Sequence, residues 1–269
     1  MLPIARFPVV TAALLALALP LAFGACSGED EKAAAEAERE SRLAEIEGQK
    51  QALDTARSEL ETTAERLRQA ESGALPAGEE VDAAELRAEV ERADAEITTA
   101  AEDLNAALTN FINEVAQQAS IGPGEPLPEV MQRAIALKAE EDMTLAREFI
   151  TEGGDYVRAL DMYGAILAYD PENQRVRDAI AEAQAMRYMD QERFSQVRNG
   201  MTPAEVEQLL GTVNLRNRRD YPDQGIIAWY FPKSAARDAA GVWFRQRGNR
   251  WEVYRIEFDA VGAPGQDDS

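Results

Sequence analysis

Hydrophobic residues recur at intervals of seven in the first half of the chain, which is the spacing of a helical packing seam. The first run has no proline before Pro76 and places aliphatic side chains at Ile46, Leu53, Leu60 and Leu67. Two helices associate when apolar residues repeat in this way, because the repeat keeps one face turned toward the partner. The pattern predicts a long helix with one packing face.

A second heptad run follows a break at residues 71–79 that contains two glycines and a proline. Its apolar positions are Ala83, Val90, Ile97, Leu104 and Phe111. Each run spans about 40 residues, or ~60 Å at 1.5 Å per residue, and a short connection favours antiparallel neighbours. We therefore expect an antiparallel coiled-coil hairpin over residues 32–119. The alternative is an intermolecular coiled coil, which would make the protein a homo-oligomer.

A Gly- and Pro-rich stretch at residues 121–128 separates the hairpin from a second helical region. One helix is expected from about residue 128 to 151, where Gly153-Gly154 follows, and another from 156 to 168. A turn at residues 170–173 then leads into a third helix that reaches about Arg193. The pattern predicts a helical region over residues 128–193.

The last part of the chain changes from helical to strand periodicity. Thr202, Pro203 and Glu205 form a capping box at the start of a short helix, and Gly211 ends it. Residues 212–224 read as a polar loop, and β-type runs follow at 226–231, 241–247 and 251–259. The predicted fold class is mostly α with a small α+β domain at residues 194–261, in which the helix precedes a three-stranded antiparallel sheet. Residues 262–269 are expected to form a disordered tail.

Alternation along the strands predicts two different faces of this sheet. Val242 and Phe244 point one way, opposite Trp243, and the run 251–259 separates Tyr254, Ile256 and Phe258 from Trp251, Val253 and Arg255. Trp and Arg are enriched where proteins bind one another. The predicted partner-binding residues are Trp243, Arg245, Arg247, Trp251 and Arg255. The alternative is that the two tryptophans shield a small core while the arginines are solvated.

The N-terminus reads as an export signal. Arg6 precedes an apolar stretch from Val9 to Phe23, and small residues stand just before Cys26. This resembles the bacterial lipobox family, which implies removal of residues 1–25, lipid attachment at Cys26 and a polar tether over residues 26–31. Two or more acyl chains hold a protein stably at a membrane. The alternatives are an uncleaved membrane anchor and an ordinary signal peptide with an incidental cysteine.

Charge and composition exclude several classes of function. The net charge is −21, and residues 194–269 carry ten acidic and ten basic side chains, so the acidity lies entirely in the helical part. Such a surface repels nucleic acid, which is not an expected partner. Histidine is absent, which removes the commonest general base and metal ligand. We expect no enzymatic activity, no cofactor and no metal. Arg216, Arg218 and Arg219 are expected to pair with the acidic helices or with a partner.

Part of the second helical region resembles the tetratricopeptide repeat family, whose unit pairs two helices. The matching positions are Met143, Ala146, Ile150, Gly154, Tyr156, Ala159, Tyr163 and Pro171. Arg147 and Ile166 depart from the usual pattern. The resemblance implies a surface that binds a peptide or protein, and the alternative is a purely structural helical connector.

The C-terminal segment resembles the SmpA/OmlA family of small envelope lipoproteins, which includes the accessory lipoprotein of the outer-membrane β-barrel assembly machine. The matching positions are Val197, Gly200, Met201, Thr202, Val206, Leu210, Gly211, Trp229, Tyr230 and Phe244. Thr212 and Val213 stand where the family usually has a proline. Similar folds occur in β-lactamase inhibitor proteins, which dock through the sheet.

Taken together, these features predict a lipid-anchored, non-enzymatic adaptor or scaffold in envelope assembly. Ser27 lacks the acidic character that retains such proteins in the inner membrane of enteric bacteria, so we expect the outer membrane, facing the periplasm. The expected partners are the membrane, through Cys26, and envelope proteins, with barrel-assembly components as candidates. The alternatives are an inhibitor or regulator of an envelope enzyme and a mechanical cell-wall spacer.

Overall fold

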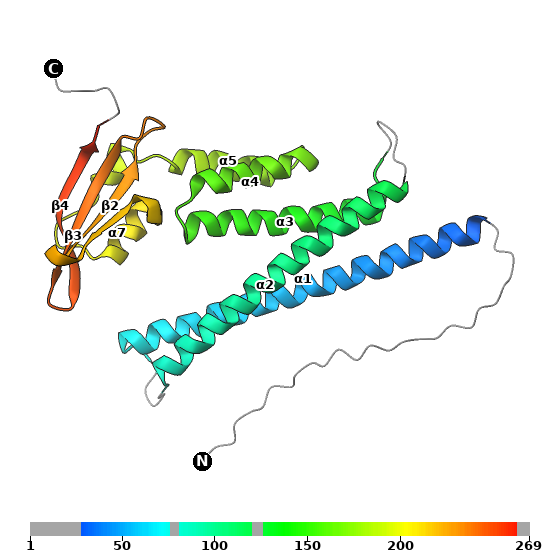
Figure 1. The fold of residues 1–269 in the computed structure, drawn as a ribbon, viewed down its shortest axis with the longest axis horizontal. Helices are drawn as coiled ribbons and strands as arrows, with labels where there is room; N and C mark the ends of the chain where they lie inside the picture. Colours follow the sequence, from blue (N-terminus) through cyan, green and yellow to red (C-terminus); the bar gives the residue numbers. More distant parts are fainter. Residues whose placement is uncertain (1–27, 76–80, 120–125, 263–269) are drawn as a thin grey trace, which may run out of the picture.

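The computed structural model describes residues 28–75, 81–119 and 126–262, and these form an elongated molecule with long helices followed by a C-terminal antiparallel sheet (Figure 1). The predicted fold class, mostly α with a small α+β part at the C-terminus, is confirmed. The predicted signal at residues 1–25, the lipid-attachment residue Cys26 and tail residues 263–269 lie outside the described residues.

The first two helices form an antiparallel pair within one chain. α1 (Gly28–Ser72) and α2 (Ala83–Ala119) are joined near one end by an Arg42–Glu114 ion pair of 2.7 Å and near the other by a pair between Arg87 and Glu71. Ile46 and Leu53 of the predicted seam are buried, and they pack with other aliphatic and aromatic side chains. These partners include Leu43, Leu104, Leu108 and Phe111. α1 begins at Gly28, so residues 28–31 of the predicted tether are helical. The acidic residues Asp30 and Glu31 suit the N-terminal part of a helix.

The third helix belongs to two cores. In α3 (Glu129–Thr151), the first turns pack Val130, Met131 and Ala134 against the hairpin. The later turns pack Met143 and Ala146 against α4 (Tyr156–Tyr169) and α5 (Gln174–Met186). α3 therefore connects the hairpin to the helices that carry the C-terminal domain.

The predicted third helix of this region is too long. α5 ends at Met186, and a separate one-turn helix, α6 (Gln191–Phe194), follows. The reason is a new N-cap, because the Asp190 side chain accepts a hydrogen bond of 2.8 Å from the backbone N–H of Arg193.

A buried carboxylate ties α1 to α3. Glu141 is 6% exposed and lies 3.2 Å from Lys50 Nζ and 3.0 Å from Arg57 Nη1. Burial by itself lowers the pKa of Lys50, but hydrogen bonds to Asp54 and Glu141 outweigh it and raise that pKa above its ordinary value. Lys50 is thus held in its charged form against Glu141.

The C-terminal domain consists of a capped helix on one side of a four-stranded sheet. In α7 (Pro203–Leu210), the predicted capping box is present, with the Thr202 and Glu205 side chains each bonded to the other's backbone N–H. The strands are β1 (Arg218–Tyr221), β2 (Ile226–Pro232), β3 (Ala239–Arg247) and β4 (Arg250–Val261), antiparallel in that order. The core between helix and sheet includes Val206, Leu210, Trp229, Phe231, Val242 and Phe244.

The sheet has one strand more than the three predicted. β1 lies in the segment expected to be a polar loop, between two 3-10 turns, η1 (Leu215–Asn217) and η2 (Pro222–Gln224). Its sequence is Arg-Arg-Asp-Tyr, which has no alternation of apolar and polar residues. A short, charged strand of this kind is typical of a sheet edge, where pairing with one neighbour suffices.

Candidate functional site

One face of the sheet is not covered by α7. α7 lies on the other side of the strands (Figure 1), where Trp229, Val242 and Phe244 are buried together with Phe194 of α6. The uncovered side carries a group of aromatic and arginine residues that we call the aromatic–arginine face. Its members are Tyr230, Trp243, Arg245, Tyr254 and Arg255.

Trp243 lies flat on the backbone of its own sheet. A Cβ at Gly241 would stand 2.5 Å from Cη2 of Trp243 and 2.9 Å from the Cβ of Ala260, so position 241 accepts only glycine without rearrangement. Tyr230 lies on β2 and pairs with Gly241 on β3. Its ring meets the indole of Trp243 edge-on, with 5.8 Å between the ring centroids. Burial raises the pKa of Tyr230 above its ordinary value. The indole is therefore fixed in place before any partner arrives.

Both arginines of the face stack on aromatic rings. The Arg255 Cζ lies 4.4 Å from the centre of the Trp243 ring, and the Arg245 Cζ lies 4.3 Å from that of Tyr254. Arg255 also pairs with Glu257. A stacked guanidinium is already ordered and keeps N–H groups free at its edge. The arrangement suits recognition of a protein surface through combined apolar and hydrogen-bonding contacts.

The prediction that Trp251 belongs to this face is wrong. Trp243 pairs with Arg255 but Phe244 pairs with Val253, so Tyr254 is an extra residue in β4. Such a β-bulge shifts the alternation of side chains. Trp251 consequently packs against the core, on the side of Phe244, and Tyr254 takes a place on the open face.

Of the other four residues predicted for this face, three lie together and one lies apart. Trp243, Arg245 and Arg255 lie together, as expected. Arg247 is exposed and stands opposite Arg250 at the β3–β4 turn, away from the stacked rings. Tyr230 and Tyr254 were missed as members of the face, and alternation on β2 alone would have found Tyr230.

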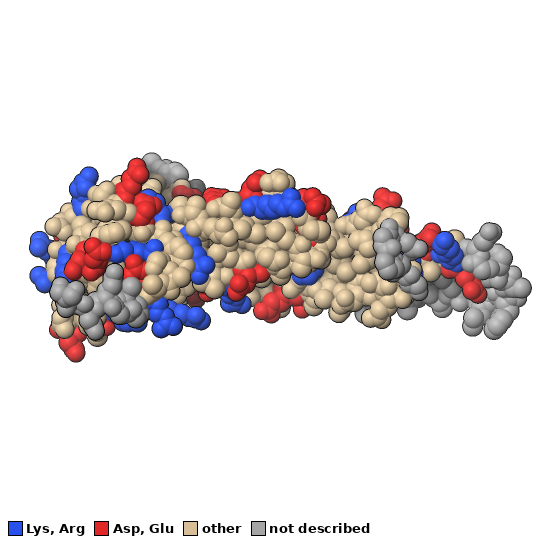
Figure 2. Space-filling model, turned by 90° about the horizontal axis from the view of Figure 1, so that it is seen from above, with Lys and Arg blue, Asp and Glu red and all other residues tan. Residues whose placement is uncertain are grey.

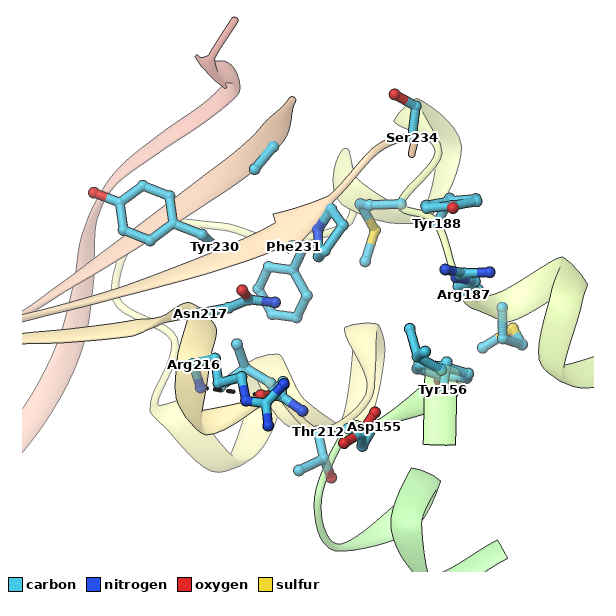
Figure 3. Close-up of a pocket in the computed structure, with 18 of the residues that line it drawn as sticks. Asp155, Tyr156, Arg187, Tyr188, Thr212, Arg216, Asn217, Tyr230, Phe231 and Ser234 are labelled. Atoms are coloured by element: carbon cyan, nitrogen blue, oxygen red, sulfur yellow. Dashed lines mark hydrogen bonds between the residues drawn. The ribbon is translucent and has the colours of Figure 1, made fainter. Parts of the chain in front are cut away.

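A second candidate site, a cleft, lies between the helical region and the C-terminal domain (Figure 3). Its volume is about 860 Å³, and its walls are the start of α4, the end of α5, residues 212–217 and the β2–β3 connection. We call it the arginine cleft, after the four arginines that line it, Arg158, Arg187, Arg216 and Arg237. Tyr230 and Phe231 lie on opposite sides of β2 in Figure 3, and both are among the residues that line the cleft. The cleft and the aromatic–arginine face are therefore adjacent sites that share Tyr230.

The floor of the cleft is fixed by contacts between segments about sixty residues apart. Gly154 has φ of 57°, and a Cβ there would meet the Thr212 carbonyl and stand 2.8 Å from the Asn214 nitrogen. Thr212 Oγ1 donates to the Thr151 carbonyl at 2.6 Å, and Asn214 Nδ2 donates to that of Gly153 at 3.1 Å. These contacts hold the C-terminal domain against the α3–α4 turn.

Within the described residues, the arginines of the segment before β2 form no ion pair with the acidic helices. These arginines are Arg216, Arg218 and Arg219. Arg218 pairs with Asp220 at 2.9 Å, and Arg219 donates to the carbonyls of Arg216 and Arg218. Arg216 lines the cleft instead. Basic side chains are concentrated at this C-terminal end of the molecule in Figure 2, whereas the sequence alone places as many acids as bases there.

Across residues 28–75, 81–119 and 126–262, no group of three or more His, Cys, Asp or Glu side chains could hold a metal ion. None of the helices in this same part of the chain combines the length and apolar character needed to cross a bilayer.

The chain matches no protein-family model, no curated protein and no solved structure. The resemblances to the lipobox, tetratricopeptide and SmpA/OmlA families therefore enter below as proposals.

Proposed function

We propose that the protein is a lipid-anchored adaptor that binds a partner protein through the aromatic–arginine face. The observation that carries this proposal is the fixed stack of Arg255, Trp243 and Tyr230 over Gly241 on an uncovered sheet. Association costs less when the contacting side chains are already ordered. Trp, Tyr and Arg are also the residues that contribute most at protein interfaces.

The anchor in this proposal is Cys26. Its support is the sequence before it, in which a positive charge, an apolar stretch and small residues precede the thiol. The hairpin then acts as a spacer, since the 45 residues of α1 correspond to ~67 Å of helix. The sheet would thus be presented at a distance from the bilayer.

A role in outer-membrane assembly, on the periplasmic side, rests on the SmpA/OmlA resemblance of residues 194–261. In this interpretation the partner is an envelope protein, with barrel-assembly components as the first candidates. The tetratricopeptide resemblance of residues 128–193 supports partner binding in the same assembly. Inhibition of an envelope enzyme through the sheet is the second candidate, because the same rigid open face suits that task.

The anchor and the contact face are tested separately. Full-length protein is expressed in a bacterium with an outer membrane, and mass spectrometry of the mature N-terminal peptide is expected to find lipid on Cys26. Cys26→Ser should move the protein out of the membrane fraction. An unmodified thiol, or unchanged fractionation of the variant, would remove the anchor from the proposal.

The face is tested by crosslinking and affinity capture of the same protein. A double substitution, Trp243→Ala with Arg255→Ala, is expected to lose the captured partner, while Arg66→Ala, at an exposed position of α1, keeps it. Recovery of barrel-assembly components supports the assembly role, and recovery of a single hydrolase supports inhibition. Unchanged capture by the double variant contradicts the proposed contact.

A further inference from the structure

The walls of the arginine cleft carry exposed apolar side chains from two segments that are distant in sequence, and a third such residue stands next to the lining in the chain. Val157 is 51% exposed, Met186 39% and Leu215 78%, and these are half of the six large hydrophobic residues exposed in the described part of the chain. Each directly precedes a cleft arginine, at positions 158, 187 and 216. Val157 and Met186 line the cleft, each with a guanidinium beside it, whereas Leu215 stands between the lining residues Asn214 and Arg216 without lining the cleft itself.

The cleft arginines have no carboxylate partner among residues 28–75, 81–119 and 126–262. Arg158 stacks on Phe149 with its Cζ 4.0 Å from the ring centre, and Arg187 stacks on Tyr188 at 5.0 Å. Neither they nor Arg216 and Arg237 form an ion pair there, although half of the arginines of the helical part do. Their N–H donors are available to a ligand.

The carboxylates at the cleft do not neutralise these arginines. Asp155 accepts the backbone N–H of Arg158 at 3.1 Å as the cap of α4, and Asp238 is bonded to Ser234 and lies 3.7 Å from Lys233. Asp161 is the remaining acid of the lining, so three carboxylates stand beside four guanidiniums. Asp155 and Asp238 form their hydrogen bonds within their own chain segments, so the guanidinium groups of the cleft outnumber the carboxylates that could neutralise them.

We propose that the arginine cleft binds an extended segment of a partner protein in which an apolar side chain is flanked by aspartate or glutamate. The apolar residue would occupy the space beside Met186 and Val157, and the flanking carboxylates would accept hydrogen bonds from Arg187 and Arg216. A volume of about 860 Å³ lies within the range of sites that enclose small ligands and peptide side chains. Charge-assisted hydrogen bonds in such a site give both affinity and orientation.

A partner segment fits this site better than a second copy of the chain. A second copy carries the full charge of −21, nearly all on its helical part, and two such surfaces repel each other. A short acidic segment needs to approach only the cleft, where the helical region meets the C-terminal domain, and the charges of that domain balance in sequence. The proposal does not rest on the aromatic–arginine face, because none of the four cleft arginines belongs to that face, although the two sites share Tyr230.

Binding is measured by titration calorimetry of the full chain in detergent at low salt, with three synthetic peptides as probes. The first is acetyl-Asp-Asp-Leu-Asp-Asp-amide, the second replaces every Asp by Asn, and the third replaces Leu by Gly. The first peptide is expected to bind at least about tenfold more tightly than either control peptide. This is the affinity ratio that corresponds to the loss of one charge-assisted hydrogen bond or of one buried aliphatic side chain. Its affinity should fall as salt rises.

The role of the two arginines is tested with a double variant, Arg187→Ala with Arg216→Ala. Its affinity for the first peptide should be at least about tenfold lower than that of the unaltered chain. Arg250→Ala, at the exposed β3–β4 turn, is the matched control and should bind as the unaltered chain does. Circular dichroism checks that the double variant is folded. The salt dependence and the Asn peptide test the unaltered chain, so the proposal stays falsifiable if that variant fails to fold.

Four outcomes would overturn the proposal. They are equal binding of the Asp and Asn peptides, unchanged binding by the folded double variant, full displacement of the peptide by inorganic phosphate at constant ionic strength, and self-association of the chain that the double variant abolishes. The third would assign the cleft to simple anions, and the fourth to a second copy.

Discussion

The helical part and the C-terminal domain of this chain are built from different interactions. The helical part carries all the surplus acid, and its long helices meet through aliphatic side chains supported by interhelical ion pairs such as Arg42–Glu114. The C-terminal domain is balanced in charge and contains all three tryptophans, with Trp229 packed edge-on against Phe244 at 4.7 Å. Charge keeps long helices solvated and apart from other molecules, whereas aromatic residues give a small sheet both its core and its recognition surface.

The largest expected effect is a loss of stability that is confined to the C-terminal domain. Phe244→Ala removes a fully buried ring from the sheet core and is expected to cost about 4 kcal/mol of unfolding free energy in that domain. Tryptophan fluorescence reports this domain alone, while the circular dichroism signal at 222 nm follows the helices. We expect an early fluorescence transition and a retained helical signal.

Leu215→Ala is the control for this loss, since Leu215 is largely exposed, and it should change stability by less than about 0.5 kcal/mol. Simultaneous loss of fluorescence and helical signals in the Phe244 variant would mean that the two regions unfold as one unit.

The contact between the α3–α4 turn and residues 212–214 should lose stability when a single methyl group is added at Gly154. Gly154→Ala places a side chain at positive φ against the Thr212 carbonyl, and we expect a loss of about 3 kcal/mol from strain and displacement of residues 212–214. Denaturant unfolding gives the free energy, and amide hydrogen exchange in the 212–217 segment should rise.

The matched control is Gly164→Ala in α4, where no atom lies within 4 Å of the new Cβ. It should stabilise the chain by up to about 1 kcal/mol, because alanine is the better helix former. If both variants behaved alike, the close approach at Gly154 would have no energetic role.

The buried ion cluster tests whether charge also contributes inside the helical part. Glu141→Gln leaves Lys50 and Arg57 without their shared carboxylate, and the expected cost is about 2 kcal/mol. The value is below that for a fully buried pair, since Arg57 is 21% exposed. Urea unfolding measures it, and Glu140→Gln, an exposed neighbour, is the control. Equal stabilities of the two variants would show that the cluster is neutral.

The smallest expected effect concerns pH. Burial raises the pKa of Glu148 above its ordinary value of 4.5, with help from Glu152, Glu141 and Asp94 and against the influence of Arg57. The folded state therefore binds a proton more tightly than the unfolded state, and stability falls as pH rises from 4.5 through the raised pKa.

Glu148→Gln should remove this fall and stabilise the chain at neutral pH by less than about 0.5 kcal/mol. Thermal unfolding as a function of pH measures the slope, with Glu152→Gln, an exposed position, as the control. An unchanged slope in the Glu148 variant would assign the pH dependence to other groups.

The helical architecture could be predicted because its signals are local. Heptad spacing located α1 and α2, Gly153 and Gly154 marked the α3–α4 turn, and the capping box at Thr202 marked α7. Each of these features is determined by residues within a few turns of one another. The alternation of Val242, Trp243 and Phe244 was local as well, and its prediction is confirmed.

The features that escaped prediction depend on contacts between distant segments. The extra residue at Tyr254 is defined only by the register of β3 against β4, and it changes which face Trp251 occupies. β1 is recognisable only through its pairing with β2. The arginine cleft has walls from α4, α5 and residues 212–217, so no single stretch of sequence reveals it.

α3 has a mechanical consequence for the whole molecule. Its N-terminal turns are embedded in one core and its C-terminal turns in another, so the hairpin cannot swivel without moving α4 and α5. The link from those helices to the sheet depends largely on hydrogen bonds, from Thr212 and Asn214 to the α3–α4 turn and from the backbone N–H of Met189 to the Pro232 carbonyl at 2.8 Å. If the protein is pulled between α1 and the sheet, we therefore expect these hydrogen bonds to break before the two cores that hold α3.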